Sequence, residues 1–455
     1  MIQQKFIDRD SELEILEKFE KKRPGLFILY GRRRIGKTEL VKQFCLGKKV
    51  VYFLADERPA DENMKELKII MAKFLADSLF EKAAISEWAE LFGEFSRKCG
   101  KKVVIIIDEF PYLINSDKAI PSIFQKIWDL NLSKKDIFLI LLGSSITMME
   151  NYVLDYRSPL YGRRSGQLKL EPLKFKHIKE FLPSYKIEEL IKVYGVTDGI
   201  PQYILKFDYK KSFIENLKEH VLKKGEFLHQ ECEILLKQEL REIGNYSTIL
   251  KAISFGRGKF GEIANLTGLD KTLVSKYLDN LINLHIIRKE FPVTETKEVR
   301  NARYMFEDNY FNFWFRFVYP NKSIIEEGRH EELISSIKTD LNQYVSAVFE
   351  KVCKQLLWDI SLPVRFDKLG RWWHKDREID LVGLNEKTKE ILFAECKWQD
   401  KVNPEKILQE LKEKAEYVDW NNGKRKEHFC IIAKSFSKRP KGVILLDLND
   451  LEKGL

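Results

Sequence analysis

The feature that most constrains this chain is an apolar strand that leads directly into a glycine-containing loop and then into a helix. Residues 26–30 are apolar, and the next eight have the pattern G-x-x-x-x-G-K-T: Gly31, Arg32, Arg33, Arg34, Ile35, Gly36, Lys37 and Thr38. The glycines permit a tight turn whose N–H groups can point at phosphate oxygens, and the following helix directs its positive end at the same anion. Lys37 is expected on the β- and γ-phosphates and the Thr38 hydroxyl on Mg²⁺. These eight residues therefore predict a nucleotide-binding P-loop.

A second apolar run ends in two carboxylates. Residues 103–107 have the unbroken apolar character of a buried parallel strand, and Asp108 and Glu109 follow. Ligands of open α/β sheets bind at the carboxyl ends of the strands, so Asp108 is expected to hold Mg²⁺ through water. Glu109 is the candidate base that polarises the attacking water. A core strand capped by solvated acids is the alternative interpretation.

Polar residues beyond the next strand could read the γ-phosphate. Residues 137–143 are apolar and end at Ser144, which suits a polar sensor but could equally cap a helix. Further on, Arg163 and Arg164 could reach the γ-phosphate and stabilise charge there, or form a basic surface turn. Both pairs of alternatives stay open at this stage.

The bulk composition indicates a globular chain of several domains. At 455 residues, two to four domains are expected. The longest apolar runs have the length of strands and the N-terminus carries no apolar signal region, which predicts a cytoplasmic protein without membrane contact. The net charge of +10 favours a polyanionic partner such as DNA, although a solvated Lys-rich surface has the same charge.

Hydrophobic periodicity divides the chain into four expected parts. Alternating strands and helices over residues 1–174 predict a doubly wound parallel sheet, and residues 175–243 are helical. Residues 244–320 have the pattern of a winged helix-turn-helix followed by an aromatic-rich helix. On its third helix, exposed Lys and Ser/Thr side chains would suit DNA, although such domains also serve as internal clamps. Residues 321–455 mix helix and strand in a further α/β unit.

The last part carries a second constellation of charged residues. Asp380 lies in one expected strand, and Glu395 and Lys397 lie in the next. Because side chains alternate along a strand, Glu395 and Lys397 share a face, so Asp380 and Glu395 could hold one Mg²⁺ with Lys397 beside it. Glu350, on an amphipathic helix upstream, could complete the acidic set. A hairpin with ordinary polar outer residues is the alternative.

These motifs together resemble those of the archaeal ATPase family, a branch of P-loop ATPases related to the STAND and AAA+ groups. The resemblance rests on YGRRRIGKTEL (30–40), VVIIIDEFPYL (103–113), LLGSSITMM (141–149), SPLYGRRSGQLKLEPL (158–173), YGVTDGIPQYIL (194–205) and EDNYFNFWFRFVYP (307–320). It implies ATP as the nucleotide, bound through Lys37, Thr38, Asp108 and Glu109. The C-terminal part is similar to restriction-endonuclease-like domains of the PD-(D/E)xK type, with a D…E-x-K metal site.

The resemblance also implies a switch. The G-x-P element through which STAND ATPases read nucleotide state matches residues 199–201, with Asp198 where a second glycine is frequent. The leading hypothesis is an ATP-hydrolysing switch that acts on duplex or branched DNA and carries a metal-dependent nuclease domain. The alternative is a STAND-like regulator whose C-terminal domain recognises a protein or nucleic acid without cutting it. A third, weaker hypothesis is a transcription regulator built on the winged helix. A homo-oligomer with an arginine supplied by a neighbouring subunit stays open.

Overall fold

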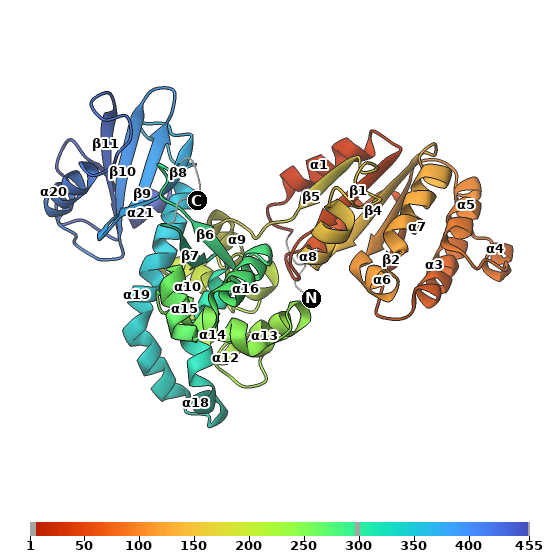
Figure 1. Cartoon of the computed structure of the whole chain (residues 1–455), viewed down its shortest axis with the longest axis horizontal. Helices are drawn as coiled ribbons and strands as arrows, with labels where there is room; N and C mark the ends of the chain where they lie inside the picture. The colour runs from red at the N-terminus through yellow and green to blue at the C-terminus, as the bar shows by residue number, and fades with distance from the viewer. Residues whose placement is uncertain (1–5, 296–300, 454–455) are drawn as a thin grey trace. The chain divides into compact units, whose positions relative to one another are not determined.

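The computed structural model describes residues 6–295 and 301–453 and divides the chain into two compact units, Met1–Pro172 and Leu173–Leu455 (Figure 1). Each unit has its own five-stranded sheet. The finer division into four parts expected from the sequence stays a prediction. Among the described residues, no helix combines the length and the apolar character needed to cross a bilayer.

The first unit is an α/β fold around a parallel sheet. In the order β2-β3-β4-β1-β5 its strands are Lys49–Leu54, Val103–Asp108, Ile137–Gly143, Gly25–Tyr30 and Gly166–Lys169. Its helices are α1 (Asp10–Glu20), α2 (Lys37–Phe44), α3 (Ala60–Leu75), α4 (Ser78–Lys82), α5 (Trp88–Lys98), α6 (Phe110–Ser116), α7 (Ile120–Ile127) and α8 (Ile146–Met148), with π-helical turns at Trp128–Leu132 and Met149–Leu154. The doubly wound parallel sheet expected for this part is confirmed in its five-stranded parallel core.

The sheet is covered on both faces, which explains why its central strands are apolar throughout. Alternate residues of the central strands, such as Ile105 and Leu139, face a core shared with α3, α5, α6 and α7. On the opposite face, Phe27 packs against Phe19 of α1, and Phe138 packs against Phe44 of α2. The ribbon shows α1 and the group α3, α5 and α7 on different sides of the strands (Figure 1).

The second unit begins with helices and a short hairpin. Its helices up to residue 326 are α9 (Ile178–Phe181), α10 (Ile187–Thr197), α11 (Pro201–Ile204), α12 (Phe213–His220), α13 (Phe227–Glu239), α14 (Ile243–Ser254), α15 (Phe260–Thr267), α16 (Lys271–Asn283), α17 (Asn309–Phe313) and α18 (Lys322–Glu326). The antiparallel pair β6 (Ile287–Glu290) and β7 (Arg303–Phe306) follows α16. The tip of the expected wing, residues 296–300, lies outside the described residues.

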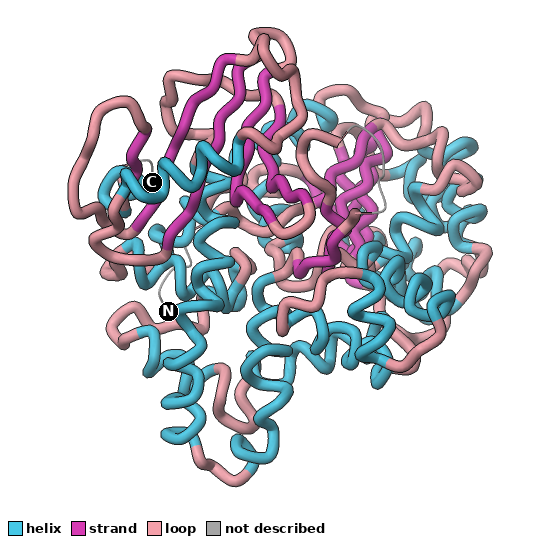
Figure 2. The backbone as a smooth tube through the Cα atoms, turned by 60° about the vertical axis from the view of Figure 1, so that its left-hand side comes forward, coloured by secondary structure: helices cyan, strands magenta, loops and turns pink. Residues whose placement is uncertain are grey.

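A mixed sheet completes the second unit. Its order is β12-β11-β10-β9-β8, with strands Ile444–Leu446, Lys426–Ala433, Glu390–Lys397, Arg377–Asn385 and Lys368–His374 (Figure 2, strands in magenta). The pairs β8–β9 and β9–β10 are antiparallel, whereas β10–β11 and β11–β12 are parallel. Helix α20 (Pro404–Ala415) packs through Leu411 and Ala415 on one face, and the long helix α19 (His330–Leu356) contacts β9 and β10. The last helix is α21 (Leu448–Glu452).

Candidate nucleotide and metal sites

The P-loop has the strand–loop–helix geometry that its sequence predicts. It leaves β1 at Tyr30 and enters α2 at Lys37, and Gly31 and Gly36 have φ angles of 154° and 98°. A Cβ on Gly31 would lie 2.6 Å from the carbonyl oxygen of Leu170, so only glycine fits at the start of the loop. Arg34 also has a positive φ, 70°.

Arg9, a residue that the sequence reasoning missed, forms a hydrogen bond to the P-loop from a position outside it. Arg9, which is buried, donates from Nη2 to the carbonyl oxygen of Ile35 (3.3 Å) and to that of Glu171 (2.8 Å). Arg33 donates to the hydroxyl of Tyr112 at 2.8 Å. Arg9 therefore connects the loop to the end of the sheet, and Arg33 connects it to the helix that follows Glu109.

Lys37 is a buried cation that lies over its own loop. Its ammonium donates to the carbonyl oxygens of Gly31 (2.8 Å) and Arg32 (3.0 Å). Burial lowers the pKa of Lys37 to about 8, against the opposing attraction of Glu109 and Asp108. A phosphate beside this ammonium would add to the attraction of these two carboxylates and favour the charged form of Lys37 further.

Thr38 and Asp108 meet at the carboxyl end of the sheet, and their expected role in holding Mg²⁺ stays a prediction. The hydroxyl of Thr38 donates to Oδ2 of Asp108 at 3.3 Å, and Oδ2 also accepts from the hydroxyl of Tyr52 at 2.6 Å. Tyr52 comes from β2, and burial and the Asp108 hydrogen bond raise its pKa well above its usual value. A hydroxyl and a carboxylate at one point are oxygen ligands of the kind that Mg²⁺ takes.

The order of the strands brings Ser144 next to Glu109. Because β4 lies between β1 and β3, Ser144 at the end of β4 comes between the P-loop and Glu109. Ser144 donates its backbone N–H to Oε2 of Glu109 at 3.2 Å and its hydroxyl to Oε1. Glu109 has a left-handed backbone with φ of 54°, an unusual conformation that non-glycine residues hold mainly where the surroundings require it.

The two arginines expected near the γ-phosphate have other partners in the structure. Arg163 forms an ion pair with Asp129 at 3.1 Å. Arg164 donates to the carbonyl oxygen of Leu154 at 3.4 Å and lies over the ring of Tyr161. Their suggested role at the nucleotide stays a prediction.

The second unit holds the G-x-P turn at the end of α10. Asp198 has a left-handed backbone, and its side chain accepts from Lys351 of α19 at 2.7 Å. A Cβ on Gly199 would lie 2.1 Å from the carbonyl oxygen of Leu173. The turn is thus closely packed against the first residue of the unit and linked to α19.

Asp380, Glu395 and Lys397 come together on β9 and β10. Oδ2 of Asp380 accepts from the backbone N–H of Cys396 at 2.9 Å, and Lys397 donates to Glu395 at 3.2 Å. Burial, with the adjacent Glu395, raises the pKa of Asp380 to about 7. Burial works against the charge of Lys397, but Glu395 and Asp380 raise its pKa above its usual value. Lys414 of α20 is a second cation on Glu395 that sequence reasoning missed.

Glu350 faces the same cavity but is paired elsewhere. It lines a cavity of about 590 Å³ together with Asp380 and Lys397, while its carboxylate forms an ion pair with Arg371 of β8. In the parts of the chain that the structure describes, no three His, Cys, Asp or Glu side chains are grouped closely enough to hold a metal ion. The expected set of Glu350, Asp380 and Glu395 is therefore not assembled in this arrangement.

The residues that sequence reasoning missed carry no motif of their own. Tyr52, Arg9, Arg371 and Lys414 stand apart from the motif residues in sequence and reach them only through the fold. Long-range pairing of this kind is set by strand order, which local patterns do not contain.

Comparison with known proteins agrees with this geometry. Residues 6–207 match a family described as an ATPase domain predominantly from Archaea, and residues 314–412 match one described as archaeal and bacterial proteins of unknown function. Among solved structures, the Walker-type ATPase PABY2304 of Pyrococcus abyssi shares the fold with a TM-score of 0.52 and 21% identity, over 68% of this chain and 96% of that one.

Relatives in Methanocaldococcus jannaschii extend the match beyond the first unit. Uncharacterized protein MJ1637 is 23% identical over 378 residues, which are 77% of this chain and 70% of that protein. Uncharacterized protein MJECL04 is 40% identical over 453 residues, which are 98% of this chain and 99% of that protein. The chain therefore belongs to the same family as MJECL04, and its residues 6–207 form an archaeal ATPase domain.

Proposed function

We propose that the first unit binds Mg²⁺ and ATP, hydrolyses the ATP, and switches the activity of residues 173–455 on DNA. The observation that carries this proposal is the convergence of Lys37, Thr38, Asp108, Glu109 and Ser144 at the carboxyl edge of one parallel sheet. Each has the chemistry that one part of a phosphoryl transfer requires.

The residues fit the nucleotide and the metal. The buried ammonium of Lys37 would neutralise the β- and γ-phosphates, and the loop N–H groups would hold their oxygens. Thr38 and Asp108 would hold Mg²⁺, which when bound draws charge from the phosphate oxygens. Tyr52 would keep the Asp108 carboxylate in place through the hydrogen bond it already donates.

Glu109 would orient and polarise the attacking water. It is held by two hydrogen bonds from Ser144, and a γ-phosphate would compete for those same donors. If Ser144 donated its hydrogen bonds to the γ-phosphate instead of to Glu109, the Glu109 carboxylate would be free to act as the base. Only ATP carries that phosphate, so this change would distinguish ATP from ADP. This is a differential contact between the ATP and ADP states, as a switch requires.

Hydrolysis tests this part directly. Glu109→Gln keeps the side-chain size but removes the base, so the rate of ATP hydrolysis should fall about a hundredfold or more while ATP still binds. Glu39→Gln, an exposed acid on α2, is the matched control and should hydrolyse ATP at the normal rate. Equal rates in Glu109→Gln and in the unchanged protein would contradict the proposed role.

For the second unit we infer a nucleic-acid module with a D…E-x-K metal site. Three helices, α14 to α16, followed by the hairpin β6–β7 have the element order of a winged helix. Glu395 is buried and the neighbouring Asp380 is half-buried, and a divalent cation would stabilise such a pair of carboxylates. Lys397 is kept charged by these acids, so it would orient water or stabilise phosphate charge and would not act as a base.

Cleavage is tested on linear, single-stranded and four-way-branched DNA with Mg²⁺ or Mn²⁺, with and without ATP. Cutting that Asp380→Ala abolishes would support a nuclease, and its dependence on ATP would report the switch.

The second candidate function is a recognition domain that binds without cutting. It is favoured by the two lysines that already neutralise Glu395, and it predicts ATP hydrolysis with no cleavage of any substrate.

A further inference from the structure

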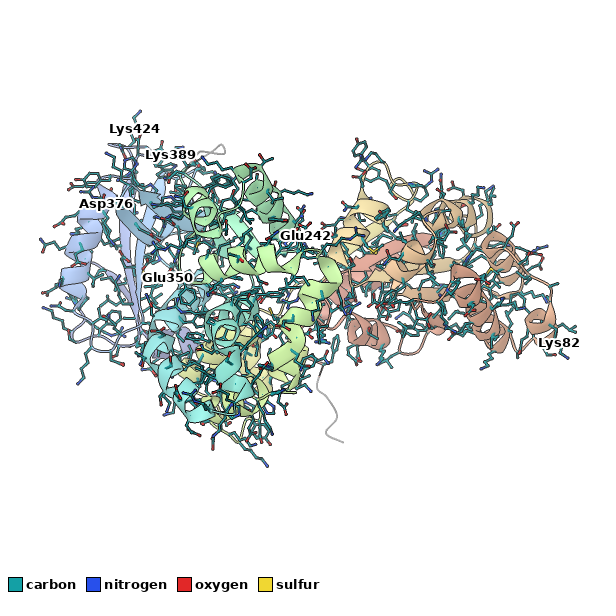
Figure 3. The ribbon with its side chains drawn as sticks, turned by 60° about the horizontal axis from the view of Figure 1, so that its bottom comes forward. Lys82, Glu242, Glu350, Asp376, Lys389 and Lys424 are labelled. Carbon is teal, nitrogen blue, oxygen red and sulfur yellow. The ribbon has the colours of Figure 1, made fainter. Side chains whose placement is uncertain are left out.

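One ion pair stands between two cavities of the second unit. The first cavity, of about 780 Å³, is lined by the hairpin β6–β7, the loop before α15, helix α19 and strands β8 and β9. The second, of about 590 Å³, lies beside Asp380 and Lys397. Glu350 and Gln343 of α19 line both cavities, and Figure 3 labels Glu350 on this helix. The pair of Glu350 and Arg371 is therefore at their common wall.

The first cavity has the character of an anion site. Seven cationic and five acidic side chains line it, and Arg288, Arg303, Arg316 and Arg371 are among the cations. Arginine is the side chain that best matches the geometry of phosphate, because its planar fork of donors can form two parallel hydrogen bonds. The excess of positive charge and the fork geometry together favour a phosphodiester as the ligand.

Arg371 has contacts on two sides. Its Nη2 pairs with Glu350, while its Nη1 lies 3.5 Å from Oε1 of Glu378 and 3.6 Å from the sulfur of Met305. Glu378 is also held by Arg303 at 2.6 Å. Loss of the Glu350 contact would thus leave Arg371 anchored at the hairpin side of the cavity.

The carboxylate of Glu350 could also point toward the second cavity, away from Arg371. Gln343, Ser346 and Glu350 are spaced along one stripe of α19, and all three line the second cavity with Asp380. Because Glu350 lines both cavities, rotation about its side-chain bonds is the movement that would turn its carboxylate from Arg371 toward the second cavity.

We propose that Arg371 binds a DNA phosphate and thereby controls Glu350, which is released to join Asp380 and Glu395 as the third carboxylate of the metal site. One charge-assisted pair at Arg371 replaces another, so the exchange costs little. Substrate then assembles the metal site, and metal binding without DNA is weak. This inference rests on the proposed function, because it needs the metal site at Asp380 and Glu395.

The experiment measures binding of Mn²⁺ to the full chain by electron paramagnetic resonance, with and without a short non-hydrolysable duplex. Mn²⁺ bound to the duplex alone is measured separately. The unchanged protein should bind Mn²⁺ about tenfold more tightly with DNA, a usual size for coupling between two sites. Arg371→Gln should bind Mn²⁺ tightly without DNA and gain nothing further from it. Glu350→Gln should bind weakly in both conditions.

Controls separate this inference from the function on which it rests. Arg365→Gln, an exposed arginine of the same unit, should behave as the unchanged protein. The inference alone is overturned if DNA leaves the Mn²⁺ affinity of the unchanged protein the same, or if Glu350→Gln keeps the DNA-dependent gain. In the Asp108→Ala background, where the metal site proposed for the first unit is removed, Mn²⁺ binding that survives Asp380→Asn would overturn the proposed metal site at Asp380 and Glu395, and this inference with it. Glu350→Gln leaves Arg371 beside Glu378 and so serves if Arg371→Gln fails to fold.

Discussion

Single residues of the two proposed sites carry charges that are largely buried before any ligand neutralises them. Lys37 is the first of these, and its pKa of about 8 lies well below that of an ordinary lysine because burial disfavours the ammonium. Polyphosphate beside it would favour the ammonium again. Nucleotide binding and protonation of Lys37 are therefore linked.

This linkage predicts proton uptake when ATP binds. Above about pH 8 the free protein holds Lys37 largely neutral, so ATP affinity should fall by up to about tenfold per pH unit and each binding event should take up a proton. Calorimetry in two buffers of different ionisation enthalpy measures that proton. Identical binding enthalpies in the two buffers at that pH would contradict the assignment.

For Asp380 of the second unit the pKa shift has the opposite direction to that of Lys37, and it bears on stability. The folded pKa of Asp380, about 7, is raised above its usual 3.8, so its contribution to stability is complete below about pH 4 and is lost as pH rises through 7. Asp380→Asn has no carboxyl group to ionise and so does not lose stability as the pH rises. Without divalent metal, the variant should gain stability relative to the unchanged protein between about pH 4 and pH 8, by an amount on the order of 4 kcal/mol. Urea unfolding of both proteins at about pH 4 and pH 8, with a chelator present, tests this. A stability difference between the two proteins that is the same at both pH values would contradict it.

At the scale of elements, two glycines fix where the chain passes close to itself. Gly199 has a φ of 72°, and a Cβ there would meet the Leu173 carbonyl oxygen at 2.1 Å, whereas Gly256, with a φ of 83°, has open space. Gly199→Ala should therefore destabilise the second unit by about 2–4 kcal/mol, and Gly256→Ala by about 1 kcal/mol from backbone strain alone. Chemical denaturation compares the two. Equal losses would mean that the close approach at Leu173 is not what requires glycine.

The elements that could be predicted are those with strong local signals. The strands of the first unit were predictable because β3 up to Ile107 and β4 carry no charged or polar side chain, and the P-loop because its pattern begins a helix. Strand β8 was missed, since Lys368–His374 mixes basic and aromatic residues around a bulge near Gly370. The pairing of Glu350 with Arg371 depends on that strand and so could not be foreseen. Asp380, Glu395 and Lys397 were predictable because alternation on two strands is a local property.

At the scale of the whole molecule, the net charge of +10 bears on the identity of the partner. If phosphate contacts dominate, DNA binding should weaken at least about tenfold between about 50 and 200 mM salt, because bound cations are released from the DNA. Fluorescence anisotropy with a labelled duplex and a branched junction measures this. Absence of DNA binding at either salt concentration would favour the alternative in which the second unit recognises a protein.

Binding of ATP with Mg²⁺ to the full chain measures whether the first unit is a working ATP site. Lys37→Ala removes the buried ammonium, whereas Lys42→Ala removes an exposed lysine on the same helix that pairs with Glu39. We expect Lys37→Ala to weaken ATP binding at least about tenfold because a charge-assisted contact is lost, while Lys42→Ala should bind ATP normally. Unchanged ATP affinity in Lys37→Ala would mean that the P-loop of the first unit is not the ATP site.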